Sequence, residues 1–265
     1  MSGLAAAAPA AETTEREAAA MAALEALAGF AASPVLLARL RRAASLVEAC
    51  DLDHPDVEEP HWAALLDAVT VQETRLYRHP AQCAGVAALL PGRLAAARAE
   101  GRKLRILSAG CATGEEAFTL AAMALSATRA VPGAGIEVLG LDLCRPALAS
   151  AEAGVIHLGM GDPLALVPAA DRPWFQDASQ NLRLHPSLRR VLQFSRANLL
   201  GWSETGFDVV FCRNVLIYLT ADARAEVLRR LVASLAPGGI LALGPTDRGS
   251  PELFPAGEAL WTAHE

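Results

Sequence analysis

The chain has 265 residues, of which 53% are hydrophobic and 20% charged, and its formal net charge is −6 at pH 7. This composition allows one large or two small domains with full hydrophobic cores and excludes an intrinsically disordered protein. The longest charge-free stretch, residues 231–246, is shorter than the roughly 18 apolar residues that a membrane-spanning helix needs. Pro237-Gly238-Gly239 also interrupts it, so we expect no insertion into a membrane. No basic segment precedes the Ala-rich N-terminal run, so we expect no secretory signal.

The five cysteines are scattered along the chain, and none of them forms a CxxC pair. This spacing disfavours both a zinc site and a disulfide framework. We therefore expect no metal and a reducing, cytoplasmic location.

The charge is unevenly distributed along the chain. Although the net charge is negative, residues 71–105 contain 7 basic and 2 acidic residues and form a basic segment. Such a segment could bind an anionic partner or ligand. It could equally be a solvated helix face whose arginine stems lie over apolar surface. We expect no nucleic-acid partner.

The first 70 residues have the pattern of a small helical domain, which we place at residues 12–70. Ser33-Pro34 has the residue types that begin a helix, and the acidic segment 51–59 suits a loop. The helices are expected over residues 13–30, 34–50 and 60–69. A linker and a connecting helix follow at residues 71–103.

Beyond residue 103 the pattern changes to short apolar runs that alternate with helical stretches. The runs read as buried strands at residues 104–109, 136–141, 191–194, 207–212 and 240–243. Helices are expected between them at residues 115–128, 146–153 and 221–235. This alternation predicts an α/β domain over residues 104–265 whose parallel sheet is covered on both faces. Residues 154–190 lack a period and read as an excursion with a short helix near Trp174-Phe175.

The first candidate binding element is the turn Gly110-Cys-Ala-Thr-Gly114 between a strand and a helix. Ligands bind beyond the carboxyl ends of strands in such sheets, and glycine lets the backbone approach them closely. The G-x-x-x-G spacing is not that of the dinucleotide fingerprint, and no P-loop Lys follows. A simple tight turn between strand and helix is the alternative.

Acidic residues flank this turn. One of Glu115 and Glu116 could meet a cationic ligand group, although both also suit a helix N-terminus. Asp142, at the end of the second strand, could accept hydrogen bonds from two ribose hydroxyls or could cap the helix near Pro146. With the glycine turn before it, Asp142 favours an adenosine ligand with a free 2′-hydroxyl.

Arg213 and Asn214 follow the carboxyl end of the fourth strand. Polar groups at that position suggest a ligand-binding site. Tyr218 follows, either as core packing or as a wall of the reacting end of a cleft. The segment Thr70–Arg78 is, by itself, a polar linker.

Together these segments resemble the CheR-type chemotaxis-receptor glutamate O-methyltransferases. The matching segments stand in order from about residue 60 to the C-terminus. They are T-V-Q-E-T-R-L-Y-R (70–78, family T-x-N-E-T-x-F-F-R), S-A-G-C-A-T-G-E-E-A-F-T (108–119), L-D-L (141–143), F-D-V-V-F-C-R-N-V-L-I-Y (207–218) and L-A-P-G-G-I-L-A-L-G (235–244).

The resemblance implies a class I S-adenosylmethionine-dependent methyltransferase, a Rossmann-like α/β fold with a mainly parallel sheet, joined to a small all-α N-terminal domain. It implies transfer of a methyl group to glutamate side chains of a chemoreceptor-like signalling protein, with S-adenosylhomocysteine as product. The expected partner is the cytoplasmic domain of a methyl-accepting chemoreceptor or a similar acidic helical protein, and the enzyme is expected to be a monomer.

The resemblance also implies the site residues. Tyr218 and Arg78 are the catalytic candidates, with Tyr218 near the transferring methyl group. The cofactor-binding candidates are Gln72, Thr74, Arg78, Ala109, Gly110, Glu116, Asp142, Asn198, Leu199, Arg213 and Asn214. A glutamate carboxylate is already anionic and the sulfonium methyl is already activated, so alignment and water exclusion suffice without a general base.

Some positions depart from the family pattern. Gln72 replaces the family Asn, and Gly244-Pro-Thr-Asp247 replaces Gly-His-Ser-Glu. In the family a basic N-terminal helix recognises acidic receptor segments, and here the second helix offers only Arg39, Arg41 and Arg42. The alternatives are therefore a non-catalytic module that binds S-adenosylmethionine or a partner, and a methyltransferase of small molecules.

Overall fold

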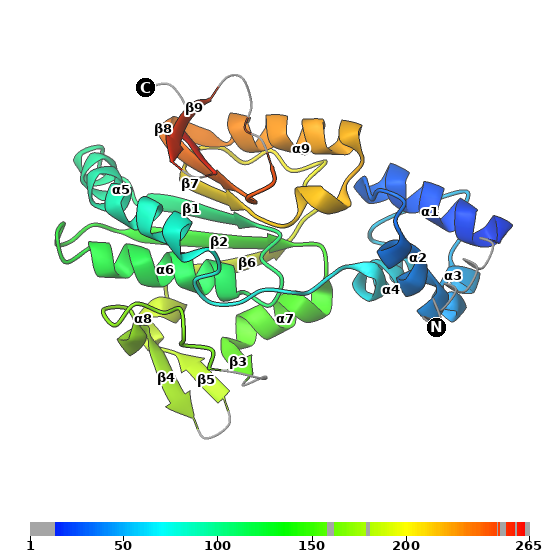
Figure 1. Cartoon of the computed structure of the whole chain (residues 1–265), viewed down its shortest axis with the longest axis horizontal. Helices are drawn as coiled ribbons and strands as arrows, with labels where there is room; N and C mark the ends of the chain where they lie inside the picture. The colour runs from blue at the N-terminus through cyan, green and yellow to red at the C-terminus, as the bar shows by residue number, and fades with distance from the viewer. Residues whose placement is uncertain are drawn as a thin grey trace, which may run out of the picture.

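The computed structural model describes residues 14–157, 162–178, 181–247, 249, 253–257 and 259–262. In this part of the chain, no helix has the length and apolar character required to cross a membrane. Figure 1 shows a helical N-terminal unit beside a larger body built on a central sheet. The predicted α/β class with a mainly parallel sheet and a small helical unit is confirmed.

The helical unit begins with α1 (Glu15–Ala28), which Thr14 caps by accepting a hydrogen bond from the Glu17 amide at 3.1 Å. Its other helices are α2 (Pro34–Arg42), α3 (Ala44–Ala49) and α4 (Pro60–Val69). They enclose a core around the fully buried Trp62.

The prediction of one continuous helix over residues 34–50 is wrong, because the chain breaks at Ala43 (φ −103°, ψ 26°) between α2 and α3. Leu40 of α2 and Val47 of α3 both lie in the Trp62 core. The break lets both helices bury their apolar residues against that core, and this packing outweighs local helix propensity.

The larger sheet has, within the described residues, seven strands in the order β6-β2-β1-β7-β8-β10-β9. Strands β6, β2, β1, β7 and β8 run parallel, and β10 pairs antiparallel with β8 and β9. The bounds are β1 (Leu104–Ala109), β2 (Ile136–Asp142), β6 (Leu192–Arg196), β7 (Phe207–Cys212), β8 (Leu235–Leu243), β9 (Phe254–Gly257) and β10 (Leu260–Thr262).

Strand β8 starts earlier than predicted, at Leu235, and runs through the segment that the sequence marks as a turn. A register shift between Phe207 and Val209 accommodates Pro237-Gly238-Gly239. The Arg93 guanidinium donates to the carbonyls of Gly238 (2.5 Å) and Pro237 (2.8 Å), so these groups find partners outside the strand ladder.

Helices cover both faces of the sheet, as the continuous apolar strands predict (Figure 1). On one face, α5 (Pro80–Ala99) and α6 (Glu115–Ala127) share a buried core with alternate residues of the strands. Ala151 of α7 (Arg145–Ala153) belongs to the same core, and α7 lies beside β2 and β6. On the other face, α9 (Ala221–Ala233) packs on the intervening residues. The helix expected as a connection, α5, is thus packed on the sheet, while the division at residues 70 and 103 stays a prediction.

The excursion between α7 and β6 contains a second, antiparallel sheet that the sequence did not predict. Its strands are β3 (Val155–His157), β4 (Phe175–Ala178) and β5 (Asn181–Leu184), with the 3₁₀ helix η1 (Arg172–Trp174) before β4 and α8 (Pro186–Arg189) after β5. The expected short helix reaches Trp174 but not Phe175, which begins β4. Strands of three or four residues are too short to show a period and form only through pairing.

Candidate active site

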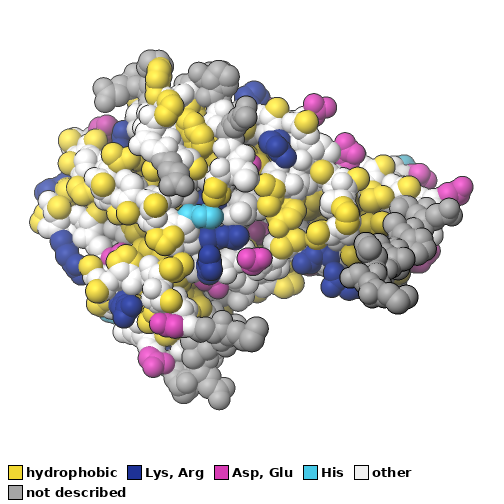
Figure 2. Space-filling view, viewed as in Figure 1, with side chains coloured by type: hydrophobic (Ala, Val, Ile, Leu, Met, Phe, Trp, Pro, Cys, Tyr) yellow, Lys and Arg dark blue, Asp and Glu magenta, His cyan; other side chains and the backbone are white. Residues whose placement is uncertain are grey.

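An open cleft lies where the helical unit meets the carboxyl ends of the parallel strands. Segments 28–36 and 69–73 line it from the helical side, and segments 110–112, 141–143, 197–200 and 213–219 contribute from the sheet side. Figure 2 shows hydrophobic side chains gathered where the helical unit joins the larger body. This is the edge at which open α/β sheets bind ligands.

The cleft brings together many of the predicted site residues. Those that line it are Arg78, Gly110, Asp142, Asn198, Leu199, Arg213, Asn214 and Tyr218. Gln72, Thr74, Ala109 and Glu116 are not among the lining residues. Their contacts with a ligand, like those of the lining residues, stay predictions.

The glycine turn after β1 depends on both of its glycines. Gly110 has φ +79°, and a Cβ atom there would lie 2.3 Å from Val215 Cγ2. Gly114 has φ +97°, and a Cβ atom would lie 2.6 Å from Phe118. A side chain at Gly110 would therefore collide with Val215 of the cleft wall, and a side chain at Gly114 would collide with the core residue Phe118.

Asp142 lies at the end of β2 and lines the cleft. Its two carboxylate oxygens accept hydrogen bonds from the backbone amides of Ala112 (2.8 Å) and Cys144 (2.9 Å). Cys144 directly precedes α7, so Asp142 orders both the glycine turn and the entry to that helix. Burial raises the pKa of the Asp142 carboxyl above its usual value. Each oxygen keeps a lone pair that can accept from a ribose hydroxyl.

Ala112 adopts a left-handed conformation, φ +48°, in the turn that donates to Asp142. A left-handed conformation costs about 1–2 kcal/mol for a residue with a Cβ atom. Replacement by glycine removes this cost but raises the conformational entropy of the unfolded chain, which lowers the free energy of unfolding by about 0.4–1 kcal/mol. Ala112→Gly is therefore expected to keep or raise the free energy of unfolding in urea, by up to about 1 kcal/mol. Ala109→Gly is the matched control, because Ala109 lies in extended β1, and it should lower the free energy of unfolding. Equal losses in both variants would show that the left-handed conformation of Ala112 is not strained.

A buried ion pair supports the floor of the cleft. Arg213 Nε lies 2.7 Å from Glu116 Oε2, and the two side chains are 2% and 8% exposed. The other Glu116 oxygen accepts from Ser108 Oγ at 2.8 Å. Arg213 also donates to the carbonyl of Arg78 and to Gln82 Oε1. Glu116 thus meets a cation of the protein itself, and both of its oxygens are engaged behind the cleft wall.

Gln82 is a site-supporting residue that the sequence did not predict. It is 4% exposed, and its amide nitrogen donates to the carbonyls of Leu243 (2.9 Å) and Ala259 (2.8 Å) while its oxygen accepts from Arg213. The sequence gives a weak signal for it, a lone amide on the apolar face of α5 next to Cys83 and Val86.

The loop around Arg78 is conformationally unusual, because Tyr77 (φ +49°) and His79 (φ +58°) are both left-handed. Arg78 lines the cleft and lies 3.7 Å from the carboxylate of Glu73, which is 81% exposed. Gln72 turns its amide nitrogen to Thr70 Oγ1 at 2.7 Å.

Among the described residues, Gln72 Oε1 and Asn214 Oδ1 are buried oxygens at or beside the cleft that have no hydrogen-bond donor. Asn214 is also left-handed (φ +59°) and lines the cleft. A buried acceptor without a donor is costly, and an amino group of a ligand would satisfy it. This feature fits a ligand with amino groups, such as the amine of adenine or the ammonium of methionine.

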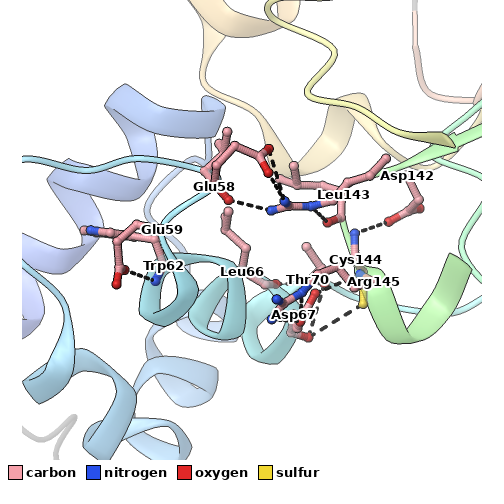
Figure 3. A network of polar contacts seen from close by, with 12 residues as sticks. Glu58, Glu59, Trp62, Leu66, Asp67, Thr70, Asp142, Leu143, Cys144 and Arg145 are labelled. Carbon is pink, nitrogen blue, oxygen red and sulfur yellow. Dashed lines mark hydrogen bonds and ion pairs between the residues drawn. The ribbon is translucent and has the colours of Figure 1, made fainter. Parts of the chain in front are cut away.

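The helical unit is fastened to the sheet on both sides of the cleft. On one side, the Asn198 amide donates to the Leu27 carbonyl at 2.7 Å, and Phe30 forms a β-bridge with Leu219. On the other, Asp67 of α4 binds Arg145 at 2.6 Å, next to Cys144 and Asp142 (Figure 3). The predicted adenine contact Asn198 therefore also holds the two units together.

A third fastening joins Arg196 of β6 to the loop before α4. Its guanidinium binds Glu58 at 3.1 Å and the Val57 carbonyl at 2.7 Å. The cleft walls are thus held at several points by groups that lie 78 or more residues apart in the sequence.

The basic residues noted in the sequence bind largely within the fold. On α2, Arg39 donates to the Thr70 carbonyl at 2.9 Å and Arg41 pairs with Glu17 at 2.8 Å. Within residues 71–105, Arg102 binds the fully buried Asp208 at 2.7 Å and Arg105 binds Glu204 at 2.9 Å. The structure thus favours intramolecular roles for these arginines.

All five cysteines are free and buried. Burial raises the pKa of Cys111 and Cys212 well above the usual range, so these thiols beside the cleft stay protonated and unreactive at neutral pH. Among the described residues no cluster of His, Cys, Asp and Glu could hold a metal ion.

Comparisons with known proteins agree with the motifs. Residues 72–255 match the family described as CheR methyltransferase, SAM binding domain. The chain is 32% identical over 190 residues to chemotaxis protein methyltransferase 1 of Vibrio cholerae, which covers 69% of this chain and 67% of that protein.

Two Pseudomonas proteins are similar as well. A probable biofilm formation methyltransferase, WspC, of Pseudomonas putida is 35% identical over 190 residues, covering 69% of this chain and 43% of that protein. Chemotaxis protein methyltransferase 1 of Pseudomonas aeruginosa is 36% identical over 155 residues, covering 56% of each. With a family match over residues 72–255 and a relative that is 32% identical over two thirds of both chains, the chain belongs to the CheR methyltransferases, whose cofactor is S-adenosylmethionine.

Proposed function

We propose that this protein transfers the methyl group of S-adenosylmethionine to glutamate carboxylates of a chemoreceptor-like signalling protein. The observation that carries the proposal is the convergence of Asp142, Asn214, Arg78 and Tyr218 on one cleft, in a chain of this family. The proposed partner is the cytoplasmic domain of a methyl-accepting chemoreceptor or a similar acidic helical protein. We also propose that the enzyme works as a monomer in the cytoplasm.

The proposed cofactor contacts follow from the walls of the cleft. Asp142 would accept from the ribose hydroxyls, while Asn198 and Leu199 would flank the adenine. The unpartnered oxygen of Asn214 would accept from an amino group of the cofactor. When bound, S-adenosylmethionine supplies an activated sulfonium methyl group.

The protein groups then have to align and shield the reactants. Arg78 is available to the carboxylate of the bound cofactor, because its ion pair with the exposed Glu73 is long and solvated and is therefore weak. Val35 and Ile217 line the cleft from its two sides, and both are exposed to solvent. Once the substrate is bound, they would keep water from the reacting atoms. A substrate carboxylate needs no general base, so alignment supplies most of the rate.

The proposal is tested by incubating the protein with methyl-labelled S-adenosylmethionine and the cytoplasmic domain of a chemoreceptor. Methyl esters of glutamate release methanol in base, so base-labile label in the receptor fraction is the expected result. Cofactor binding without any label transfer to acidic helical proteins would instead support a non-catalytic module. The orientation of Gln72 toward Thr70, where the family has Asn, is the observation that favours this second candidate.

Tyr218→Phe tests the role proposed for the reacting end. The Tyr218 side chain lines the cleft beside Ile217. Loss of its hydroxyl group is therefore expected to lower kcat about tenfold and to leave the affinity for S-adenosylhomocysteine within about twofold of the wild type. Steady-state kinetics and calorimetry measure the two quantities. Equal losses in kcat and affinity would assign Tyr218 to ground-state binding.

A further inference from the structure

A buried carboxylate lies outside the cleft, in the segment between strands β3 and β4 of the small antiparallel sheet. Asp171 is 7% exposed and does not line the cleft. It accepts hydrogen bonds from the hydroxyls of Tyr77 (2.7 Å) and Ser126. Among the residues that the structure describes, no cation forms an ion pair with Asp171, so neutral donors must compensate its burial.

Tyr77 connects this carboxylate to the cleft, because Arg78 is the next residue. Tyr77 is 2% exposed, and its backbone amide donates to Thr119 Oγ1 at 3.0 Å. Burial and the neighbouring Asp171 raise the pKa of the phenol, so its hydroxyl remains a donor. Both ends of the residue are therefore fixed.

Such anchors are needed because the backbone is left-handed on both sides of Arg78, at Tyr77 and His79. Disfavoured conformations persist only where the surroundings determine them. The anchors of this loop are the Tyr77 hydroxyl, the Tyr77 amide and the Arg78 carbonyl, which accepts from Arg213.

The same hydrogen-bond chain continues into the small sheet. Trp174 Nε1 donates to Ser126 Oγ at 2.9 Å, and Trp174 ends η1, directly before β4. The Trp174 amide donates to the Asp171 carbonyl at 3.1 Å. A continuous set of bonds thus runs from the start of β4 through Ser126 and Asp171 to Tyr77.

We propose that Asp171 is a positioning residue that acts through Tyr77 to hold Arg78 in the cleft, and thereby raises the affinity for the cofactor. The inference rests on the proposed contact between Arg78 and the cofactor. The family motif has Phe where this chain has Tyr77, so the hydroxyl bond is a feature of this chain.

Tyr77→Phe is the test, because it removes one oxygen and introduces the family's residue, so the variant is expected to fold. Binding of S-adenosylhomocysteine to the full chain is measured by calorimetry, and thermal unfolding is measured in parallel. We expect Kd to rise about fivefold, KM for S-adenosylmethionine to rise in proportion, and kcat at saturating cofactor to stay within about twofold.

Two further variants separate positioning from stability. Asp171→Asn keeps an oxygen that accepts from Tyr77, so it should leave Kd within about twofold of the wild type. Ser126→Ala removes the other hydroxyl bond to Asp171; it is expected to lower Tm and leave Kd within about twofold.

An unchanged Kd in Tyr77→Phe would overturn the inference, and so would Kd changes that follow the loss of Tm in all three variants. The wild type is titrated first. If it does not bind S-adenosylhomocysteine, the proposed function fails together with this inference, whereas a binding wild type and an equally binding Tyr77→Phe defeat the inference alone.

Discussion

Replacement of Arg213 by methionine is expected to lower the free energy of unfolding by about 3–5 kcal/mol and to remove measurable binding of S-adenosylhomocysteine. The substitution leaves the Glu116 carboxylate, 8% exposed, without its cation. It also takes a donor from the Arg78 carbonyl and from Gln82. Urea unfolding and calorimetry measure the two losses.

Two variants control this experiment. Arg229→Met breaks the ion pair with Glu226 on the surface of α9, where Arg229 is 63% exposed, and should leave stability and binding unchanged. Arg213→Met combined with Glu116→Leu removes both charges and should recover part of the stability but not the binding. If Arg213→Met were no less stable than Arg229→Met, the buried pair would not support the cleft.

The second large effect is expected from Asp142→Ala, which should weaken the binding of S-adenosylhomocysteine by at least about tenfold. One or two hydrogen bonds between a carboxylate and ribose hydroxyls contribute about 1.5–3 kcal/mol each, and 1.4 kcal/mol corresponds to a tenfold change in Kd. Asp142→Asn keeps one acceptor and should lie between the wild type and Asp142→Ala.

Asp67→Ala is the matched control, since Asp67 binds Arg145 on the same wall but does not line the cleft. It should change Kd by no more than about twofold. A folded Asp142→Ala with the affinity of the wild type would remove Asp142 from the cofactor site.

The affinity should also depend on pH through Asp142. Burial raises the pKa of this carboxyl, so on acidification it takes up a proton at a higher pH than an ordinary aspartate. Protonation turns an acceptor into a donor, and the affinity for S-adenosylhomocysteine should then fall as the pH drops through that pKa. Asp142→Ala should lose this dependence, and an identical pH profile in both proteins would contradict it.

Local signals were sufficient for two strands at the centre of the large sheet, although they did not predict the antiparallel strands β9 and β10 at its edge. Strand β7 (Phe207–Cys212) and strand β1 (Leu104–Ala109) begin and end where the sequence predicts, because a strand buried on both faces is a continuous apolar run. Asp142 could be predicted at the cleft for a related reason, since its position at the end of β2 fixes the edge on which it lies.

Other features depend on contacts that no local pattern encodes. Glu116 was predicted to face a ligand and is paired with Arg213, which lies 97 residues away in the sequence. Asn198 donates to Leu27, 171 residues away, and thereby joins the two units beside the cleft. Gln82 and Asp171 attracted no prediction, although each ties a cleft loop to a distant element.

The sequence by itself determined the α/β class, the family motifs and the side of the sheet on which their residues emerge, because these follow from the period of apolar residues and the direction of each strand. Only the tertiary structure decided which polar groups are paired, where α2 ends and α3 begins, and that a small sheet is bonded to the Arg78 loop. A hydrogen bond or an ion pair forms between whichever groups the packed chain brings within about 3 Å, and that distance is set by the whole fold.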